Sequence, residues 1–230
     1  MKVDFKSTIA HKPLFRYLDS QFVDSFFDSG ELLLTTYRRC RAHEDLVRRD
    51  DREGKFNYYM THENSAIAIM RIVGDRSYML CTSSLASRNL AERFRTDSHF
   101  VIEDPSGFCD AISAALPGLQ TVKHGPCEYL SERSETKLLS APIQPNMTKI
   151  LAAIASGEPS DLEELFNEMH QDFSRRFDDQ TTDVSYFAKP NTFAGEEEFR
   201  MIWTMDEELD DGKIIYCPDA RQFCKRAKHF

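Results

Sequence analysis

Short runs of apolar, β-branched and aromatic residues recur early, in the middle and late in this 230-residue chain. They include residues 14–18, 31–37 and 199–204, and helical patterns lie between them. This interleaving predicts an α+β fold, with one domain over residues 1–230 and helices around a β core. No run approaches the roughly 18–20 apolar residues of a membrane helix, so we expect no membrane contact.

Turn and cap residues delimit the first predicted elements. Ser20 can cap a helix that ends at Gly30, with three phenylalanines on one face, Phe22, Phe26 and Phe27. Residues 66–73 predict a largely buried strand, and a turn at 74–75 makes 78–82 its hairpin partner. Residues 88–95 predict a helix and 99–103 a strand. Asp104-Pro105 then predicts the start of a further helix.

The second half of the chain begins with a strand pattern at 128–130. Residues 147–178 predict a helical segment within the domain, broken around 157–159. Residues 184–188 predict a strand and 189–195 a loop. Residues 213–217 predict the last strand, followed by a short basic helix over 218–228.

The negative charge is concentrated in one segment. The chain carries 29 basic and 38 acidic side chains, a net charge of −9, whereas residues 150–211 alone hold 4 basic and 17 acidic ones, a net charge of −13. This argues against broad, unspecific nucleic-acid binding but leaves room for a local anion site elsewhere. It also predicts that the 150–211 segment can face a basic protein partner.

Several functional classes lack their motifs here. The sequence has no G-x-x-x-x-G-K-[ST], no G-x-G-x-x-G and no G-x-S-x-G, which argues against P-loop NTPases, Rossmann dehydrogenases and typical α/β-hydrolases. Its six cysteines form no C-x-x-C pair and its seven histidines are scattered, so we expect neither a metal site nor a disulfide framework. Residues 1–6 have no apolar signal-peptide region, and we expect a cytoplasmic protein with reduced thiols.

Two carboxylates near the end of the chain are the first candidate catalytic groups. Glu196 and Glu198 precede an apolar strand, and residues two apart on a strand face the same side. Two carboxylates on one face can stabilise a cationic transition state and orient a hydroxyl. The alternative is an acidic loop edge in which Glu198 pairs with Arg200 or another arginine.

Arginines form the candidate anion sites. Arg16 lies between Phe15 and Tyr17 on the first predicted strand, where a guanidinium suits phosphate or carboxylate binding. An ion pair with Asp19 or a late glutamate explains it equally well. A further cluster can meet phosphates or can form a mixed-charge helix face among acidic neighbours. Its members are Arg38, Arg39, Arg41, Arg48, Arg49 and Arg52.

The order of these segments resembles the ADP-ribosyltransferase fold. The first strand of that fold corresponds to Leu14-Phe15-Arg16-Tyr17, and the second corresponds to Leu33-Leu34-Thr35-Thr36-Tyr37. The E-x-E motif before the last strand corresponds to Glu196-Glu197-Glu198-Phe199. The chain is also similar to a large family of uncharacterised bacterial domains found near toxin and phage-defence genes. That resemblance rests on the same first segment, on residues 78–84, and on Lys189, Phe193 and Glu196-Glu197-Glu198-Phe199-Arg200.

The resemblance implies a split, mainly antiparallel β core and NAD as substrate, with no metal. It implies that Glu198 stabilises the oxocarbenium-like centre and that Glu196 helps to activate the acceptor. It implies an NAD-binding role for a set of residues on the first two strands: Arg16, Tyr17, Thr35, Thr36 and Tyr37.

Three functions follow as hypotheses. The first is an NAD-using ADP-ribosyltransferase or NAD glycohydrolase that acts as a bacterial toxin or phage-defence effector, with a protein or nucleic acid as acceptor. The second is a non-enzymatic module that binds a nucleotide or a protein on the same scaffold. The third is nucleic-acid processing, which predicts a salt-dependent affinity. It would use three arginines of the cluster and three basic residues of the tail: Arg38, Arg39, Arg41, Lys225, Arg226 and Lys228.

Overall fold

The computed structural model describes residues 12–45, 49–62, 65–138 and 184–227, together with residues 155, 157, 160 and 163. The predicted helical segment 147–178 therefore lies outside the described residues, apart from those four isolated positions. The chain divides into two compact units. Unit 1 comprises residues 1–55, 72–133 and 186–230, and unit 2 comprises residues 56–71 and 134–185. The expectation that residues 1–230 form a single domain stays a prediction, since a division into two compact units does not test it.

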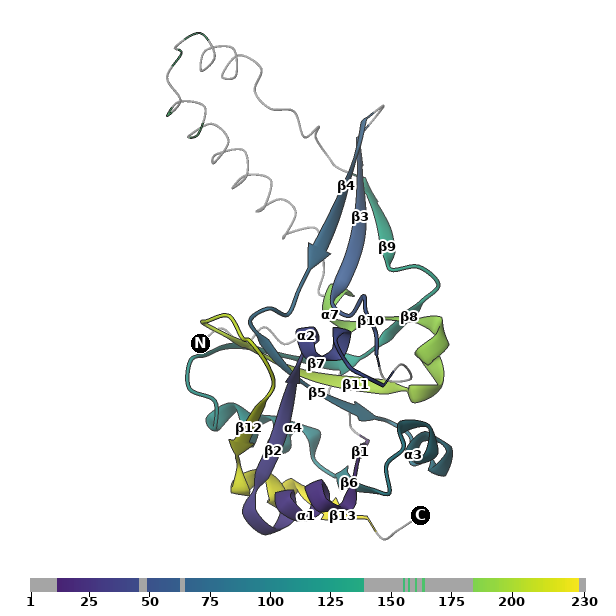
Figure 1. Ribbon diagram of the computed structural model, residues 1–230, viewed down its shortest axis with the longest axis vertical. Coiled ribbons are helices and arrows are strands. Elements are labelled where there is room, and N and C mark those ends of the chain that lie inside the picture. Colours follow the sequence, from purple (N-terminus) through teal and green to yellow (C-terminus); the bar gives the residue numbers. More distant parts are fainter. Residues whose placement is uncertain are drawn as a thin grey trace. The chain divides into compact units, whose positions relative to one another are not determined.

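An eight-stranded sheet forms the centre of unit 1, and every pairing in it is antiparallel (Figure 1). The strand order is β12-β2-β5-β1-β6-β13, and β11 pairs with both β5 and β7. The strands are β1 (Leu14–Leu18), β2 (Glu31–Thr36), β5 (Ser77–Ser83), β6 (Ser98–Ile102), β7 (Leu119–Pro126), β11 (Glu198–Met205), β12 (Lys213–Tyr216) and β13 (Cys224–Arg226). A separate parallel pair joins β8 (Glu128–Leu130) to β10 (Ala188–Pro190).

Short helices connect these strands. They are α1 (Ser20–Ser29), α2 (Tyr37–Arg41), α3 (Arg88–Phe94), α4 (Pro105–Ala114), α7 (Val184–Phe187) and the 3-10 helices η1 (Asn191–Glu196) and η2 (Pro218–Phe223). Two predicted caps are confirmed. Gly30 ends α1 in the left-handed region at φ 86°, and the Asp104 carboxylate accepts the Ser106 and Gly107 N–H groups, each at 3.1 Å, at the start of α4. The α+β class with a mostly antiparallel sheet is confirmed.

The larger apolar core of unit 1 lies between one face of the sheet and the helices α1 and α4. Trp203 on β11 is fully buried there, and its indole N–H donates to Ser113 Oγ at 3.0 Å. Helical residues in this core include Val23, Phe26, Phe108 and Ile112, and strand residues include Leu32, Leu34, Leu80, Phe100 and Met201. Because successive strand residues point to opposite faces, their neighbours build the other face.

A smaller cluster covers that other face and includes Tyr37, Met79 and Ile202. The register between β11 and β5 places further residues on this face, because Arg200 lies opposite Cys81 and Glu198 lies opposite Ser83. Residues directly opposite one another in an antiparallel pair share a face. The second face therefore carries the charged residues of β11 next to polar residues of β5.

Unit 2 contains a three-stranded sheet of order β4-β3-β9 within its described part. Its strands are β3 (Lys55–His62), β4 (Ser65–Ile72) and β9 (Ser134–Leu138), and β3 runs parallel to β9. The Tyr58 hydroxyl and Ser185 Oγ lie 2.9 Å apart in this unit. None of the described helices in either unit is both long and apolar enough to cross a membrane.

Two predictions about the first helix and the middle strands were wrong in detail. Asp19, not Ser20, is the N-cap of α1, and Phe22 is 51% exposed while Val23 and Phe26 are buried. The buried stripe follows the i, i+3 spacing of 23 and 26. The predicted 66–73 and 78–82 hairpin does not form, because β4 pairs with β3 and β5 pairs with β1, β2 and β11.

Three further local predictions were corrected. Residues 66–73 are not largely buried, since Met70 is 60% exposed. Residues 184–187 form helix α7 rather than a strand, and the predicted loop 189–195 contains the end of β10 and most of η1. The basic helix predicted at 218–228 was wrong: η2 covers only Pro218–Phe223, and residues 224–226 form β13, which pairs with β6 at the edge of the sheet.

Candidate functional site

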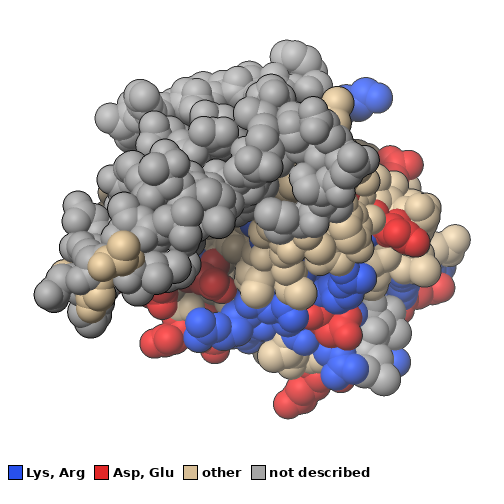
Figure 2. All heavy atoms as spheres, turned by 90° about the horizontal axis from the view of Figure 1, so that it is seen from above, with Lys and Arg blue, Asp and Glu red and all other residues tan. Residues whose placement is uncertain are grey.

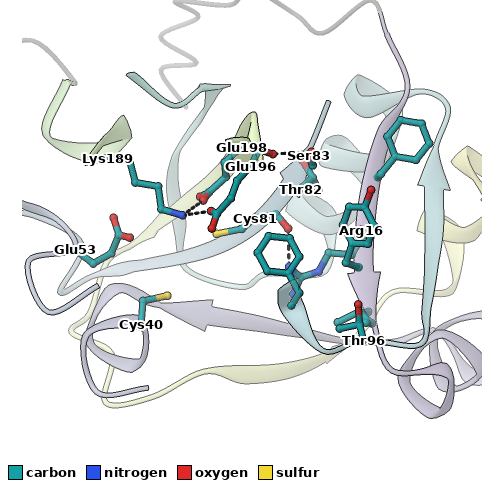
Figure 3. Close-up of a pocket in the computed structure, with 14 residues that line it drawn as sticks. Arg16, Cys40, Glu53, Cys81, Thr82, Ser83, Thr96, Lys189, Glu196 and Glu198 are labelled. Carbon is teal, nitrogen blue, oxygen red and sulfur yellow. Dashed lines mark hydrogen bonds and ion pairs between the residues drawn. The ribbon is translucent and has the colours of Figure 1, made fainter. Parts of the chain in front are cut away.

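A cavity of about 200 Å³ lies in unit 1 on the polar part of the second sheet face (Figure 3). Residues 15–18 of β1 and 81–83 of β5 line it, together with Phe94 and Thr96 from the end of α3 and the turn after it. Cys40 and Glu53 contribute on another side. The remaining wall consists of Lys189, Glu196 and Glu198. Four sequence-predicted site residues thus line one cavity: Arg16, Tyr17, Glu196 and Glu198.

Arg200 anchors the ionic network beneath this cavity. Its side chain is fully buried, its Nε donates to Glu198 Oε1 at 2.6 Å, and its Nη1 lies 2.8 Å from Glu53 Oε1. Nη1 also donates to the Tyr186 carbonyl at 2.7 Å. A buried charge is tolerated when it is paired and hydrogen-bonded. These contacts pair the Arg200 charge with two carboxylates and a carbonyl, although Arg200 Nη2 has no hydrogen-bond partner among the described residues. The alternative expectation that Glu198 pairs with Arg200 is confirmed.

Lys189 joins the two candidate catalytic carboxylates, as Figure 3 shows. Its ammonium donates to Glu196 Oε2 at 2.6 Å and also to Glu198 Oε2. The same Nζ lies 4.7 Å from the centre of the Phe193 ring. Arg93 approaches the outer oxygen of Glu196, with 3.5 Å between Nη2 and Oε1. Glu196 and Glu198 therefore share one buried cation.

The backbone brings the two carboxylates together by a route that the sequence did not indicate. Glu196 ends η1, Glu197 adopts a left-handed conformation at φ 41°, and Glu198 begins β11. The predicted strand spacing of Glu196 and Glu198 was therefore wrong, although both side chains reach Lys189. Side chains from the end of β5 fix this turn: Ser83 Oγ donates to the Glu196 carbonyl at 2.7 Å, and Ser84 Oγ donates to Glu197 Oε2 at 2.6 Å.

The pKa values of the two glutamates are displaced in opposite directions. Burial alone would raise the pKa of Glu198, but the charges of Arg200 and Lys189 outweigh it and hold that pKa below its ordinary range. Burial raises the pKa of Glu196 despite the opposing charge of Lys189. The pKa of one carboxylate is thus lowered and that of the other is raised, and such opposite displacements within one cavity are a pattern of acid–base sites.

The residues of β1 form the opposite wall. Arg16 Nη1 donates to the Cys81 carbonyl at 2.6 Å, which holds the guanidinium against β5. The Tyr17 hydroxyl donates to the Leu85 carbonyl at 2.6 Å and accepts the Ser87 N–H at 2.7 Å. These bonds fix a cationic group and aromatic surface across the cavity from the carboxylates.

The predicted residues of the second strand do not line the cavity. Thr36 Oγ1 accepts the Arg39 N–H at 3.2 Å and caps α2, and Thr35 lies opposite Met79 in the sheet. Tyr37 is fully buried, with its ring centre 6.0 Å from the Arg200 guanidinium. In this structure these three residues support the scaffold behind the site, and their assignment to NAD binding stays a prediction.

The cysteines beside the cavity do not resemble activated nucleophiles. All six cysteines of the chain are free thiols. Burial raises the pKa of Cys40 to about 11 and raises that of Cys81 well above its ordinary value, so both remain protonated at neutral pH. Within the described residues, no group of three or more His, Cys, Asp or Glu side chains could hold a metal ion.

Ion pairing accounts for the described members of the arginine cluster in α2. Arg38 pairs with Asp210 at 3.6 Å, and Arg39 pairs with Asp211 at 3.5 Å. Arg41 lies 3.7 Å from Asp75. On the described surface visible in Figure 2, basic and acidic side chains lie among one another. These contacts favour the mixed-charge interpretation over a phosphate-binding face.

Some site residues were given no role by the sequence. Glu53 stands in a stretch rich in both charges, and nothing in its spacing distinguishes it from its neighbours. Lys189 and residues 81–83 belong to motifs that were noted, but their contacts with Glu196 and Glu198 depend on long-range pairing.

Comparison of the chain with protein-family models, curated proteins and solved structures finds no match. The chemistry of the site therefore rests on its own geometry.

Proposed function

We propose that this protein is an NAD-using enzyme, either an ADP-ribosyltransferase or an NAD glycohydrolase. The observation that carries the proposal is that Arg16, Glu196 and Glu198, which lie up to 182 positions apart in sequence, line one cavity. Arg16 supplies a fixed cation for an anionic ligand on one wall. The glutamates supply negative charge on the other, where a cationic centre would be stabilised.

The proposed reaction begins with cleavage of the bond between the ribose C1′ of NAD and the pyridinium nitrogen. The electron pair of that bond leaves with nicotinamide, which becomes neutral, and C1′ acquires positive charge. Glu198 faces this charge as a carboxylate that Arg200 and Lys189 hold ionised at neutral pH. An acceptor oxygen or a water then bonds to C1′ and transfers its proton to Glu196.

The size of the cavity supports binding of one end of the dinucleotide. Pockets that enclose a drug-sized ligand measure roughly 300–1,000 Å³, whereas this cavity measures about 200 Å³. It suits a nicotinamide ring and its ribose, with the remainder of NAD extending outward. The motif resemblance is what supports the setting of a bacterial toxin or phage-defence effector with a macromolecular acceptor.

Release of nicotinamide from NAD tests the proposal. We expect release by the wild type and a loss of about 100- to 1,000-fold in kcat for Glu198→Gln. Asp50→Asn is the matched control, because Asp50 forms a buried pair with Arg133 but does not line the cavity. It should lower stability and leave the rate per folded molecule unchanged. No release by the wild type with NAD and protein or RNA acceptors would contradict the proposal.

One observation favours a binding module without catalysis. Both side-chain oxygens of Glu198 are occupied, one by Arg200 and one by Lys189. In that case the network is a structural support for the wall of a nucleotide-binding cavity. Calorimetric binding of NAD that is lost in Arg16→Met, without nicotinamide release by the wild type, would identify this function.

A further inference from the structure

Lys189 supplies the buried positive charge that lies between Glu196 and Glu198. The Lys189 side chain is 9% exposed, and those of Glu196 and Glu198 are 5% and 6% exposed. Lys189 lies opposite Tyr129 in the parallel β8–β10 pair, and the Tyr129 hydroxyl accepts the Glu198 N–H at 2.7 Å. One pair of short strands thus holds both the side chain and the backbone of Glu198.

Glu196 and Glu198 depend on Lys189 to different degrees. Glu198 retains Arg200, at 2.6 Å, as a second buried cation. The other cation near Glu196 is Arg93, which lies farther away at 3.5 Å and has a side chain that is 35% exposed. Two buried carboxylates close together cannot both stay ionised without a compensating charge. Without Lys189, the proton would therefore go to Glu196.

The geometry points to Lys189 as the positioning residue of the site, which holds Glu196 and Glu198 as one unit and keeps Glu196 free to accept a proton. This inference rests on the proposed function for its catalytic meaning, but the electrostatic role is testable alone. The charged groups that face Glu196 are Lys189 from β10, Glu198 from β11 and Arg93 from α3. Glu53 and Arg200 act on Lys189 from the same network.

NMR titration of the Glu196 side-chain carboxyl in ¹³C-labelled protein tests the role directly, with the resonance assigned through Glu196→Gln. In Lys189→Met we expect Glu196 to titrate about 1–3 pH units higher than in the wild type, because its main neutralising charge is gone. Lys189→Arg keeps the charge and should titrate as the wild type does. Lys189→Gln keeps a hydrogen-bond donor and serves where the methionine variant fails to fold.

Lys225→Met is the matched control. Lys225 Nζ donates to Glu103 Oε1 at the same 2.6 Å as the Lys189–Glu196 bond, but its side chain is 70% exposed. This variant should leave the Glu196 titration unchanged. An unchanged titration in both neutral Lys189 variants would overturn the inference.

Nicotinamide release separates this inference from the proposed function. If both hold, the rise of the rate with pH should move upward in Lys189→Met by the same amount as the titration. A shifted titration in a protein that never cleaves NAD would support the role of Lys189 and reject the enzyme. If the wild type cleaves NAD, and both Lys189→Met and Lys189→Gln keep the pH profile of the wild type, the role of Lys189 is rejected and the proposed enzyme is left intact.

Discussion

Arg200 Nε donates to Glu198 Oε1 at 2.6 Å, and the two residues are next neighbours on the same face of β11. The guanidinium is fully buried, so its charge is compensated by the protein and not by water. This pair fixes the carboxylate that the proposed reaction uses. Stability and function are therefore linked through one strand.

Arg200→Met should destabilise the protein by about 3–5 kcal/mol, because it leaves Glu53 and Glu198 buried without their shared cation. Urea unfolding measures the change. Arg226→Met removes an exposed arginine that pairs with Asp24 and should cost less than about 1 kcal/mol. Similar losses in the two variants would show that the buried network contributes no more than a surface pair.

Glu198→Gln should lower stability most at neutral pH. Burial opposes ionisation of Glu198, but Arg200 and Lys189 outweigh it and lower its pKa from the ordinary 4.5. Stability from the ionised carboxylate is thus fully present above pH 4.5 and is lost as the pH falls toward the lower folded pKa. Urea unfolding over a pH series should show a constant difference between wild type and variant above pH 4.5 and a shrinking one below it. A difference that grows in acid would contradict this sign.

Gly74→Ala should destabilise unit 1 by about 1–3 kcal/mol, since Gly74 has φ +92° and an added Cβ would overlap Cδ2 of the Tyr37 ring. The strain would reach the ring that supports Arg200. Gly195→Ala is the control, because no heavy atom lies within 4 Å of the Cβ that it adds. Equal thermal midpoints for Gly74→Ala and wild type would show that Tyr37 can move aside at no cost.

Arg16→Met should weaken NAD binding about 10- to 100-fold, because a hydrogen bond to a charged group contributes about 1.5–3 kcal/mol. Isothermal titration calorimetry measures the affinity. Arg88→Met removes an exposed arginine that pairs with Glu92 outside the cavity, and it should bind NAD as the wild type does. Equal weakening in both variants would indicate a general charge effect instead of a specific contact.

Local signals in the sequence predicted much of unit 1. Gly30 and Asp104 predicted their helix ends because a left-handed C-cap and a side-chain N-cap need only nearby residues. Strands β1, β2 and β11 followed from their apolar runs. Local signals did not predict which strands pair with one another, since β5 pairs with β1 and β11, which lie far from it in sequence.

In the candidate site, too, residue types and motifs could be predicted from the sequence, whereas contacts between distant segments could not. Arg16, Glu196 and Glu198 were chosen from residue type and motif order, and they line one cavity. Lys189 was given no role, because its bonds to both glutamates depend on the β8–β10 pairing and on the left-handed Glu197. Thr35, Thr36 and Tyr37 do not line the cavity, since Thr36 caps α2 and Tyr37 begins it, and their assignment to NAD binding stays a prediction.

The most direct measurement of the central claim is a crystal structure of Glu198→Gln with bound NAD, since this variant should bind the dinucleotide and turn it over slowly. We predict that the nicotinamide ribose occupies the cavity, with C1′ about 3–3.5 Å from the residue 198 side chain and Arg16 in contact with a phosphate. NAD bound elsewhere, or a cavity that stays empty at saturating NAD, would contradict the account.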